Sequence, residues 1–280
     1  MTWLLYSLLA GLFFALSRVV ARLVLREEGN PLAFTAIHDF ISGLVLLPLL
    51  LAGFHLPQHN ITWLFFLGVV IFAFLSDWLT FIALKKINVS VYQITNQVRH
   101  IFVLVGGLLL FSEAVTQYKI VAVILIIVGV IVMLYEKAKI HWSVGIWITI
   151  FSTLCAVIAF FFVKYAVVDF SETAMASLEL LSIGLISFGL LGFNGKKIFN
   201  ELKINKWGLI ISGALFGLFE LFLFFALKAG EVSKVIPVTQ SALVFGVILG
   251  IGFLKERERL VQKIIGTILI ILGIVFMNFV

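Results

Sequence analysis

Long apolar stretches separated by short polar ones follow one another along the whole chain. A helix that crosses a lipid bilayer needs about 20 mostly apolar residues, and ten stretches of roughly this length can be placed. The longest connection between them is GFNGKKIFNELKINK at 192–206, so no soluble domain is expected. The pattern predicts an all-α integral membrane protein with ten transmembrane helices. The predicted spans lie near residues 3–25, 32–53, 62–84, 89–110, 117–135, 143–165, 173–192, 207–228, 232–254 and 261–279.

The composition supports this class. Hydrophobic residues make up 62% of the 280 residues and charged ones only 12%, about half the 25% that is usual in soluble proteins. The net charge of +6 comes from Lys and Arg at the ends of the spans rather than from a basic domain. It therefore indicates membrane orientation, not nucleic-acid binding. These cations gather in the odd-numbered connections, which predicts that both termini lie on the non-cytoplasmic side. A compact chain of this kind is typical of a prokaryotic plasma (inner) membrane protein.

An internal repeat divides the chain into two halves. Shifting the sequence by 143 positions aligns 83–113 with 226–256 without a gap, and nine of the 31 positions are identical. We therefore expect two five-helix units, 1–138 and 139–280. Because five is an odd number, the second unit enters the membrane upside down, which makes an inverted repeat of the kind found in transporters. Two such halves can pack in two ways and open a shared central site to either side of the membrane in turn.

The stretch SVYQITNQVRH at 90–100 is polar although apolar residues surround it. The repeat aligns it with SKVIPVTQSAL, which begins a span of ordinary length, so the polar run belongs to the fourth helix and not to a loop. Helical spacing puts Tyr92, Asn96 and Arg99 on one ridge and Gln97 on the next. A polar face of this breadth cannot be exposed to lipid. We expect it to line a wet cavity between the two halves.

Arg99 is the sharpest candidate for substrate binding. At 1.5 Å per residue it lies about 15 Å into its helix, too deep to reach the membrane surface with ease. It either receives a carboxylate or phosphate group of the substrate, with donors from Tyr92, Asn96 and Gln97, or pairs with a carboxylate on a neighbouring helix. Gln97 and Gln240 are equivalent in the repeat. We expect these two glutamines to approach each other and bind a polar solute.

Carboxylates recur inside the predicted spans, where an ionisable group needs a partner, water or a function. Asp77 and Glu220 occupy equivalent places in the two halves. They either bind and release a proton during transport, or they neutralise an arginine or a cationic substrate. Trp78 stands beside Asp77 and either stacks on a substrate or packs in the core. We expect the same two roles, proton coupling or charge pairing, of Arg18, Asp39 and Glu179.

Each half closes with a glutamate just beyond its fourth helix, in LFSEAVTQ and FLKERERL, and with a fifth helix that contains glycine. Two copies of such a unit resemble the drug/metabolite transporter superfamily and its EamA-type members. The resemblance covers essentially the whole chain. It implies a central cavity lined by helices 1 to 4 and 6 to 9, and transport of small organic solutes. The HDF at 38–40 also resembles a feature of members that import choline.

These observations favour a secondary transporter that moves a small polar or zwitterionic, amino-acid-like metabolite by alternating access. Arg18 and Arg99 suit a carboxylate, whereas Asp77 and Glu220 suit an amine. The alternatives are a transporter of a quaternary or primary amine such as choline, and, from another class, a channel or a lipid flippase. The sequence holds no catalytic motif, so an enzyme is not expected. We expect no metal and no cofactor other than H+ as a coupling ion, and a monomer or homodimer surrounded by membrane lipids.

Overall fold

All regular elements in the described part of the chain are helices. The computed structural model describes residues 2–24, 31–52, 54–84, 86–87, 89–134, 143–252, 260–277 and 279. The elements in chain order are α1 (Thr2–Val24), α2 (Pro31–Leu46), the 3-10 helix η1 (Leu47–Ala52), α3 (Asn60–Leu84), α4 (Val89–Thr95), the 3-10 helix η2 (Asn96–Val98), α5 (Arg99–Phe111), α6 (Gln117–Leu134), α7 (Val144–Ala166), α8 (Glu172–Leu190), α9 (Gly195–Ala229), α10 (Val232–Val238), α11 (Ser241–Gly252) and α12 (Leu260–Met277).

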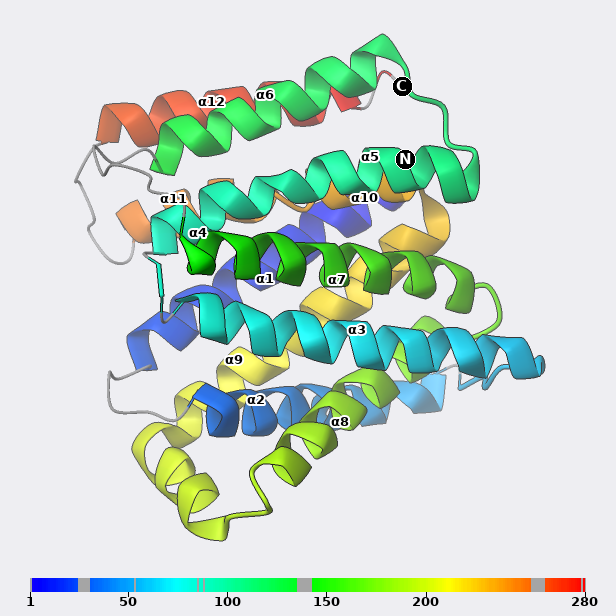
Figure 1. Cartoon of the computed structure of the whole chain (residues 1–280), viewed down its shortest axis with the longest axis vertical. Coiled ribbons are helices and arrows are strands. Elements are labelled where there is room, and N and C mark those ends of the chain that lie inside the picture. The colour runs from blue at the N-terminus through cyan, green and yellow to red at the C-terminus, as the bar shows by residue number, and fades with distance from the viewer. Residues whose placement is uncertain are drawn as a thin grey trace.

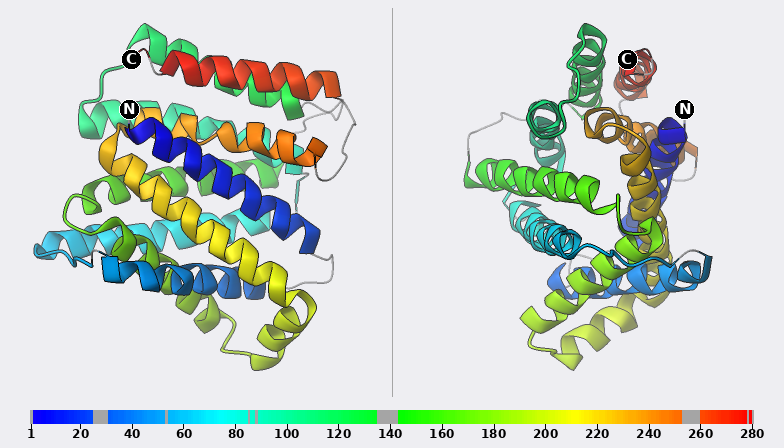
Figure 2. Two further views of the ribbon diagram at one scale, coloured as in Figure 1. Left: turned by 180° about the vertical axis from the view of Figure 1, so that it is seen from behind. Right: turned by 90° about the vertical axis from the view of Figure 1, so that its right-hand side faces the viewer.

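The helices lie side by side in one bundle (Figure 1). α1 packs along α9, α3 packs along α7, and α2 packs against both α8 and α9. α6 and α12 form a pair at one edge of the bundle, as both views in Figure 2 show. Glycine permits the close contact of this pair, because a side chain on Gly129 would meet the carbonyl oxygen of Gly266 at 2.8 Å. Small residues at helix contacts of this kind are typical of membrane proteins.

In the described part of the chain, eight helices are long and apolar enough to cross a membrane, and two shorter apolar helices, Asn96–Phe111 and Gln117–Met133, accompany them. The protein is therefore a multi-pass integral membrane protein, as the hydropathy pattern predicts. The two shorter helices fall on the predicted fourth and fifth spans. The count of ten spans and the inverted relation of the two halves stay predictions, and the proposed boundary between the halves lies outside the described residues.

Two of the predicted spans are interrupted. The fourth changes from α4 through the 3-10 turn at Asn96–Val98 to α5. The ninth breaks at Thr239 and Gln240 between α10 and α11. The break in the ninth follows Pro237, which has no backbone N–H to continue the helix. Under the shift of 143 positions, the break at 239 and 240 corresponds to positions 96 and 97 in the fourth span.

The predicted long connection at 192–206 is mostly helix, contrary to the sequence-based expectation. α9 already begins at Gly195, so only the turn at 191–194 joins it to α8. Gly192 adopts a left-handed conformation there, with φ of 61°, which glycine accommodates without a steric penalty. The 35 residues of α9 span about 50 Å at 1.5 Å per residue, more than the bilayer core of about 30 Å. The amphiphilic start of α9 therefore extends beyond the apolar layer.

Candidate functional site

Four carboxylates from four different helices converge inside the bundle. Asp39 comes from α2, Asp77 from α3, Glu179 from α8 and Glu220 from α9. They lie close enough for their charges to act on one another. Asp39 and Glu179 are 3% and 5% exposed, whereas Asp77 and Glu220 are half-buried. We call these four residues the carboxylate cluster.

Two oxygens of the cluster have no hydrogen-bond partner among the described residues. Asp39 Oδ1 lies 2.9 Å from His38 Nδ1, but Asp39 Oδ2 and Glu179 Oε2 are unpartnered although buried. A buried acceptor without a donor costs about 1–3 kcal/mol, and more when it is charged. Ionisable groups at membrane depth mark substrate and ion pathways for this reason. The cluster is therefore the best-defined candidate site in the described part of the chain.

Arg18 of α1 is the cation whose charge acts on Asp77 and Glu220. Its guanidinium carbon lies 4.7 Å from the ring centre of Phe14 and 5.7 Å from that of Phe216. Phe219 packs against both of these rings, 4.8 Å and 5.3 Å away. Aromatic faces at this distance attract cations. Carboxylates outnumber the cation, so the site as a whole favours a positively charged ligand group.

The polar run of the fourth span forms hydrogen bonds to α3 and α7. Tyr92 Oη lies 3.0 Å from Thr80 Oγ1, and Thr80 Oγ1 lies 2.8 Å from Ser152 Oγ. The Ser152 hydroxyl also donates to the carbonyl oxygen of Ser76 at 3.0 Å. This chain of hydroxyl groups joins three helices. Hydrogen bonds within the protein therefore explain part of the polarity of the run.

The rest of the run surrounds the 3-10 turn. The hydroxyl of Thr153 in α7 donates to Asn96 Oδ1 at 2.7 Å, and Gln97 Oε1 lies 3.1 Å from His100 Nε2. Arg99 Nε donates to the carbonyl oxygen of Asn96 at 3.4 Å. No described carboxylate lies within ion-pair distance of the Arg99 guanidinium. The ion-pair alternative for Arg99 thus finds no partner among the described residues.

Of the other predicted residues, Trp78 is 45% exposed and stacks on Phe74, with ring centres 6.3 Å apart. It does not pack in the core. Gln240 is half-buried at the break of the ninth span. That these residues, together with Tyr92, Asn96, Gln97 and Arg99, bind a substrate stays a prediction. The fold brings together Asp39, Asp77, Glu179, Glu220 and Arg18. From the sequence, only Asp77 and Glu220 were related to each other, through the repeat.

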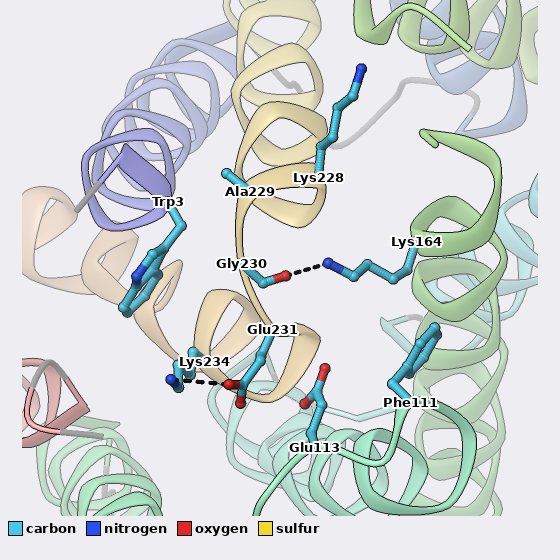
Figure 3. Close-up of a pocket in the computed structure, with 9 residues that line it drawn as sticks. All are labelled: Trp3, Phe111, Glu113, Lys164, Lys228, Ala229, Gly230, Glu231 and Lys234. Atoms are coloured by element: carbon cyan, nitrogen blue, oxygen red, sulfur yellow. Dashed lines mark hydrogen bonds and ion pairs between the residues drawn. The ribbon is translucent and has the colours of Figure 1, made fainter. Parts of the chain in front are cut away.

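The sequence did not indicate a second polar region, a cavity of about 400 Å³ where α5, α7, α9 and α10 end or begin (Figure 3). Glu113 accepts the backbone N–H groups of Val232 at 2.8 Å and Ser233 at 3.1 Å, and also the Ser233 hydroxyl. It thereby caps the first turn of α10 from the other half of the chain. The signal for this contact was present, because both Glu113 and Ser233 are identical in the repeat. Glu256, the counterpart of Glu113, lies outside the described residues.

Lysines complete this region. Lys119 is fully buried and donates to Glu231 Oε2 at 2.5 Å and to the Ser233 hydroxyl at 2.8 Å. Burial opposes the ionised form of Glu231, but hydrogen bonds from Lys119 and Lys234 hold its pKa below the ordinary value. Lys164 donates to the carbonyl oxygens of Leu227 and Gly230, both at 2.5 Å, at the end of α9. Lys164 therefore satisfies carbonyl groups where α9 ends.

An all-helical bundle of membrane-spanning length with carboxylates and an arginine gathered inside it is typical of a transporter. The profile of the EamA-like transporter family matches residues 1–135 and 143–279. The chain belongs to this family, within the drug/metabolite transporter superfamily. Members of the family are generally transporters and not enzymes.

No curated protein matches the chain. A solved structure described only as "Crystal structure of protein" is similar over 99% of this chain and 96% of its own, with a TM-score of 0.79. The two sequences are 12% identical, so the likeness concerns the fold alone.

Proposed function

We propose that the protein is a secondary transporter that moves a small zwitterionic, amino-acid-like metabolite across the membrane by alternating access. The observation that carries this proposal is the carboxylate cluster beside the rings of Phe14 and Phe216. Carboxylates and aromatic faces together suit an ammonium group. Arg99, which no described carboxylate neutralises, suits the carboxylate of the same solute.

The proposed mechanism uses ten spans arranged as two inverted halves, 1–138 and 139–280. Support comes from the two interrupted helices, which break at equivalent positions of the repeat. Discontinuous helices near the midplane commonly form substrate sites in transporters. α5 and α11 begin at these breaks. Repacking of the halves then exposes the site to each side in turn, in an inner membrane with both termini on the non-cytoplasmic side.

Coupling to H+ is part of the proposal. Asp77 and Glu220 are equivalent in the repeat and half-buried, so the two halves contribute an equivalent pair of carboxylates to the cluster. The unpartnered oxygens of Asp39 and Glu179 could each be satisfied by a proton on a neighbouring carboxylate or by a substrate N–H group. Binding a proton in one state and substrate in the other would couple substrate transport to proton movement across the membrane.

A second candidate function is transport of an amine without a carboxylate, such as choline. The aromatic rings around Arg18 favour it, because a quaternary ammonium group binds such faces well. Arg99 decides between the two candidates. It should be essential for a zwitterion and dispensable for choline.

The test is exchange of labelled amino acids and of labelled choline by purified protein in liposomes, with and without a pH gradient. Glu220→Gln should reduce exchange of the true substrate at least about tenfold, since a lost charged interaction of about 1.5–3 kcal/mol corresponds to a factor of ten or more. Arg99→Ala should abolish exchange of an amino acid and spare choline. Lys203→Gln, on an exposed lysine of α9, is the matched control. Flux that does not saturate would indicate a channel, and lipid transfer without solute exchange would indicate a flippase.

A further inference from the structure

We propose that Arg18 is a resident cation of the carboxylate cluster, which occupies the place of a substrate ammonium group until a cationic substrate displaces it. The inference rests on the proposed function, in which this cluster binds an ammonium group. It adds that the protein carries its own competitor for the site. It also names the group of the substrate that this site takes, an ammonium group whose charge replaces that of the guanidinium.

The first observation is the position of the guanidinium between aromatic rings. It lies over Phe14 of its own helix and over Phe216 of α9, at 4.7 Å and 5.7 Å. A ligand cation within about 6 Å of a ring centre gains the same attraction. The rings and the carboxylates therefore suit the same kind of cation, and the Arg18 guanidinium occupies the faces of the rings in the structure.

The second observation is how loosely Arg18 is held. It forms no hydrogen bond or ion pair with a described residue, although its charge acts on Asp77 and Glu220. Its side chain is exposed. A structural arginine in a membrane helix is expected to have fixed carboxylate partners. Arg18 can leave the rings without breaking a short ion pair, so displacement by a ligand costs little.

The third observation is that the backbone beneath Arg18 is fixed. The hydroxyl of Ser17 is buried and donates to the carbonyl oxygen of Ser212 in α9 at 2.9 Å. This bond joins α1 to α9 one residue before Arg18. Movement of Arg18 is then a rotation of its long side chain and does not require the helices to separate. A side chain with several rotatable bonds suits this exchange.

The buried unpartnered oxygens show what remains unfilled while Arg18 is in place. Asp39 Oδ2 and Glu179 Oε2 accept no hydrogen bond from a described residue, so the guanidinium does not satisfy the deeper half of the cluster. A small ammonium group can approach these oxygens, whereas the guanidinium is tethered to α1. The arginine is thus an incomplete substitute for the ligand, as a displaceable competitor must be.

The experiment measures binding in detergent solution by calorimetry, with choline and glycine betaine as probes, and does not depend on transport. Removing the competitor in Arg18→Gln should tighten choline binding about tenfold, and Arg18→Lys, which keeps a shorter cation, should give a smaller gain. Millimolar guanidinium should compete with choline in Arg18→Gln more strongly than in the unaltered protein. Lys203→Gln serves as the control and should bind like the unaltered protein.

Weaker or unchanged choline binding in Arg18→Gln would overturn the proposal, because Arg18 would then support the site or play no part in it. Loss of betaine binding with unchanged choline binding would also overturn it, and would make Arg18 a carboxylate ligand. If Arg18→Gln does not fold, Arg18→Lys provides the second test, since its shorter cation should still allow tighter choline binding than in the unaltered protein, and unchanged or weaker binding would overturn the proposal. A protein that binds as expected but transports nothing would refute the proposed function and leave this inference standing.

Discussion

Gly11 of α1 lies directly against Ser241, the first residue of α11, and no space for a methyl group separates them. A side chain on Gly11 would also meet the backbone N of Ala242 at 3.0 Å and the carbonyl oxygen of Thr239 at 3.2 Å. The break of the ninth span is therefore packed against the first helix of the other half. The break of the fourth span also contacts a helix of the other half, because Asn96 is hydrogen-bonded to Thr153 of α7.

Gly11→Ala should destabilise the protein. The added methyl group must displace backbone atoms at the break, and overpacking of this kind costs about 1–3 kcal/mol. The measurement is thermal unfolding in detergent, in which the melting temperature should fall by several degrees. Gly246→Ala in α11 is the matched control, because no atom lies within 4 Å of its added methyl group. Equal melting temperatures for the two variants would contradict the close contact at Gly11.

Thr153→Val should weaken the contact between α7 and the first break. Valine keeps the shape of threonine but leaves Asn96 Oδ1 without its donor at 2.7 Å, which costs about 1–3 kcal/mol for a buried acceptor. Thr153→Ser restores the hydroxyl and should recover most of the stability. Unfolding of the two variants by a denaturing detergent checks this. A serine variant as unstable as the valine variant would mean that the methyl group matters and the hydrogen bond does not.

Glu113→Ala should loosen the start of α10. The carboxylate accepts two backbone N–H groups and a hydroxyl there, and loss of a helix cap costs about 1 kcal/mol, with more expected for a buried charged one. Glu113→Gln keeps one acceptor oxygen and should be intermediate. Hydrogen exchange of the amides of Val232 and Ser233 reports the change locally. Unaltered exchange in the alanine variant would show that another group caps the helix.

The link between the end of α7 and the start of α3 should depend on acid pH. The backbone N–H of His59 holds the pKa of Asp169 below its ordinary value of 3.8, against a smaller effect of burial, and the His59 ring and the Thr62 hydroxyl add to this. A lowered folded pKa means that the ionised form stabilises the fold. This contribution is complete well above the ordinary pKa of 3.8, at about pH 5 and higher, and is lost as the pH falls through the lowered value.

Asp169→Asn removes this contribution. The stability difference between the unaltered protein and the variant should be constant from neutral pH to about pH 5 and should shrink at lower pH. Melting temperatures recorded over this range test the prediction. A difference that does not change down to about pH 3 would contradict it.

The sequence predicts the membrane class and the positions of the spans because apolar length alone determines both. The repeat further places Asp77 and Glu220 at matching depths. It cannot show that Asp39 and Glu179 join them, because the choice of neighbouring helices depends on packing between distant segments. The sequence therefore directs attention to Arg99, whose polar neighbours are adjacent in the chain, and treats the carboxylates as secondary.

The two helix breaks also show what the sequence alone can and cannot predict. Pro237 gives a physical reason to expect the break in the ninth span. The 3-10 turn at Asn96–Val98 contains no proline or glycine, so nothing in its residues predicts it. Asn96 of the turn is bonded to Thr153 of α7, and this contact exists only in the folded bundle.

The turn that joins α9 to α10 would be a poor place for an inserted epitope, although it is short, polar and near the end of the bundle. Lys164 donates to the carbonyl oxygen of Gly230, and Glu113 accepts the backbone N–H of Ser233 just after the turn. An insertion would separate these side chains from the backbone groups that they bind. The turn at 191–194 is different, because neither Gly192 nor Gly195 has an atom within 4 Å of an added side chain. A rigid fusion partner for electron cryomicroscopy, or an affinity tag, should be tolerated there.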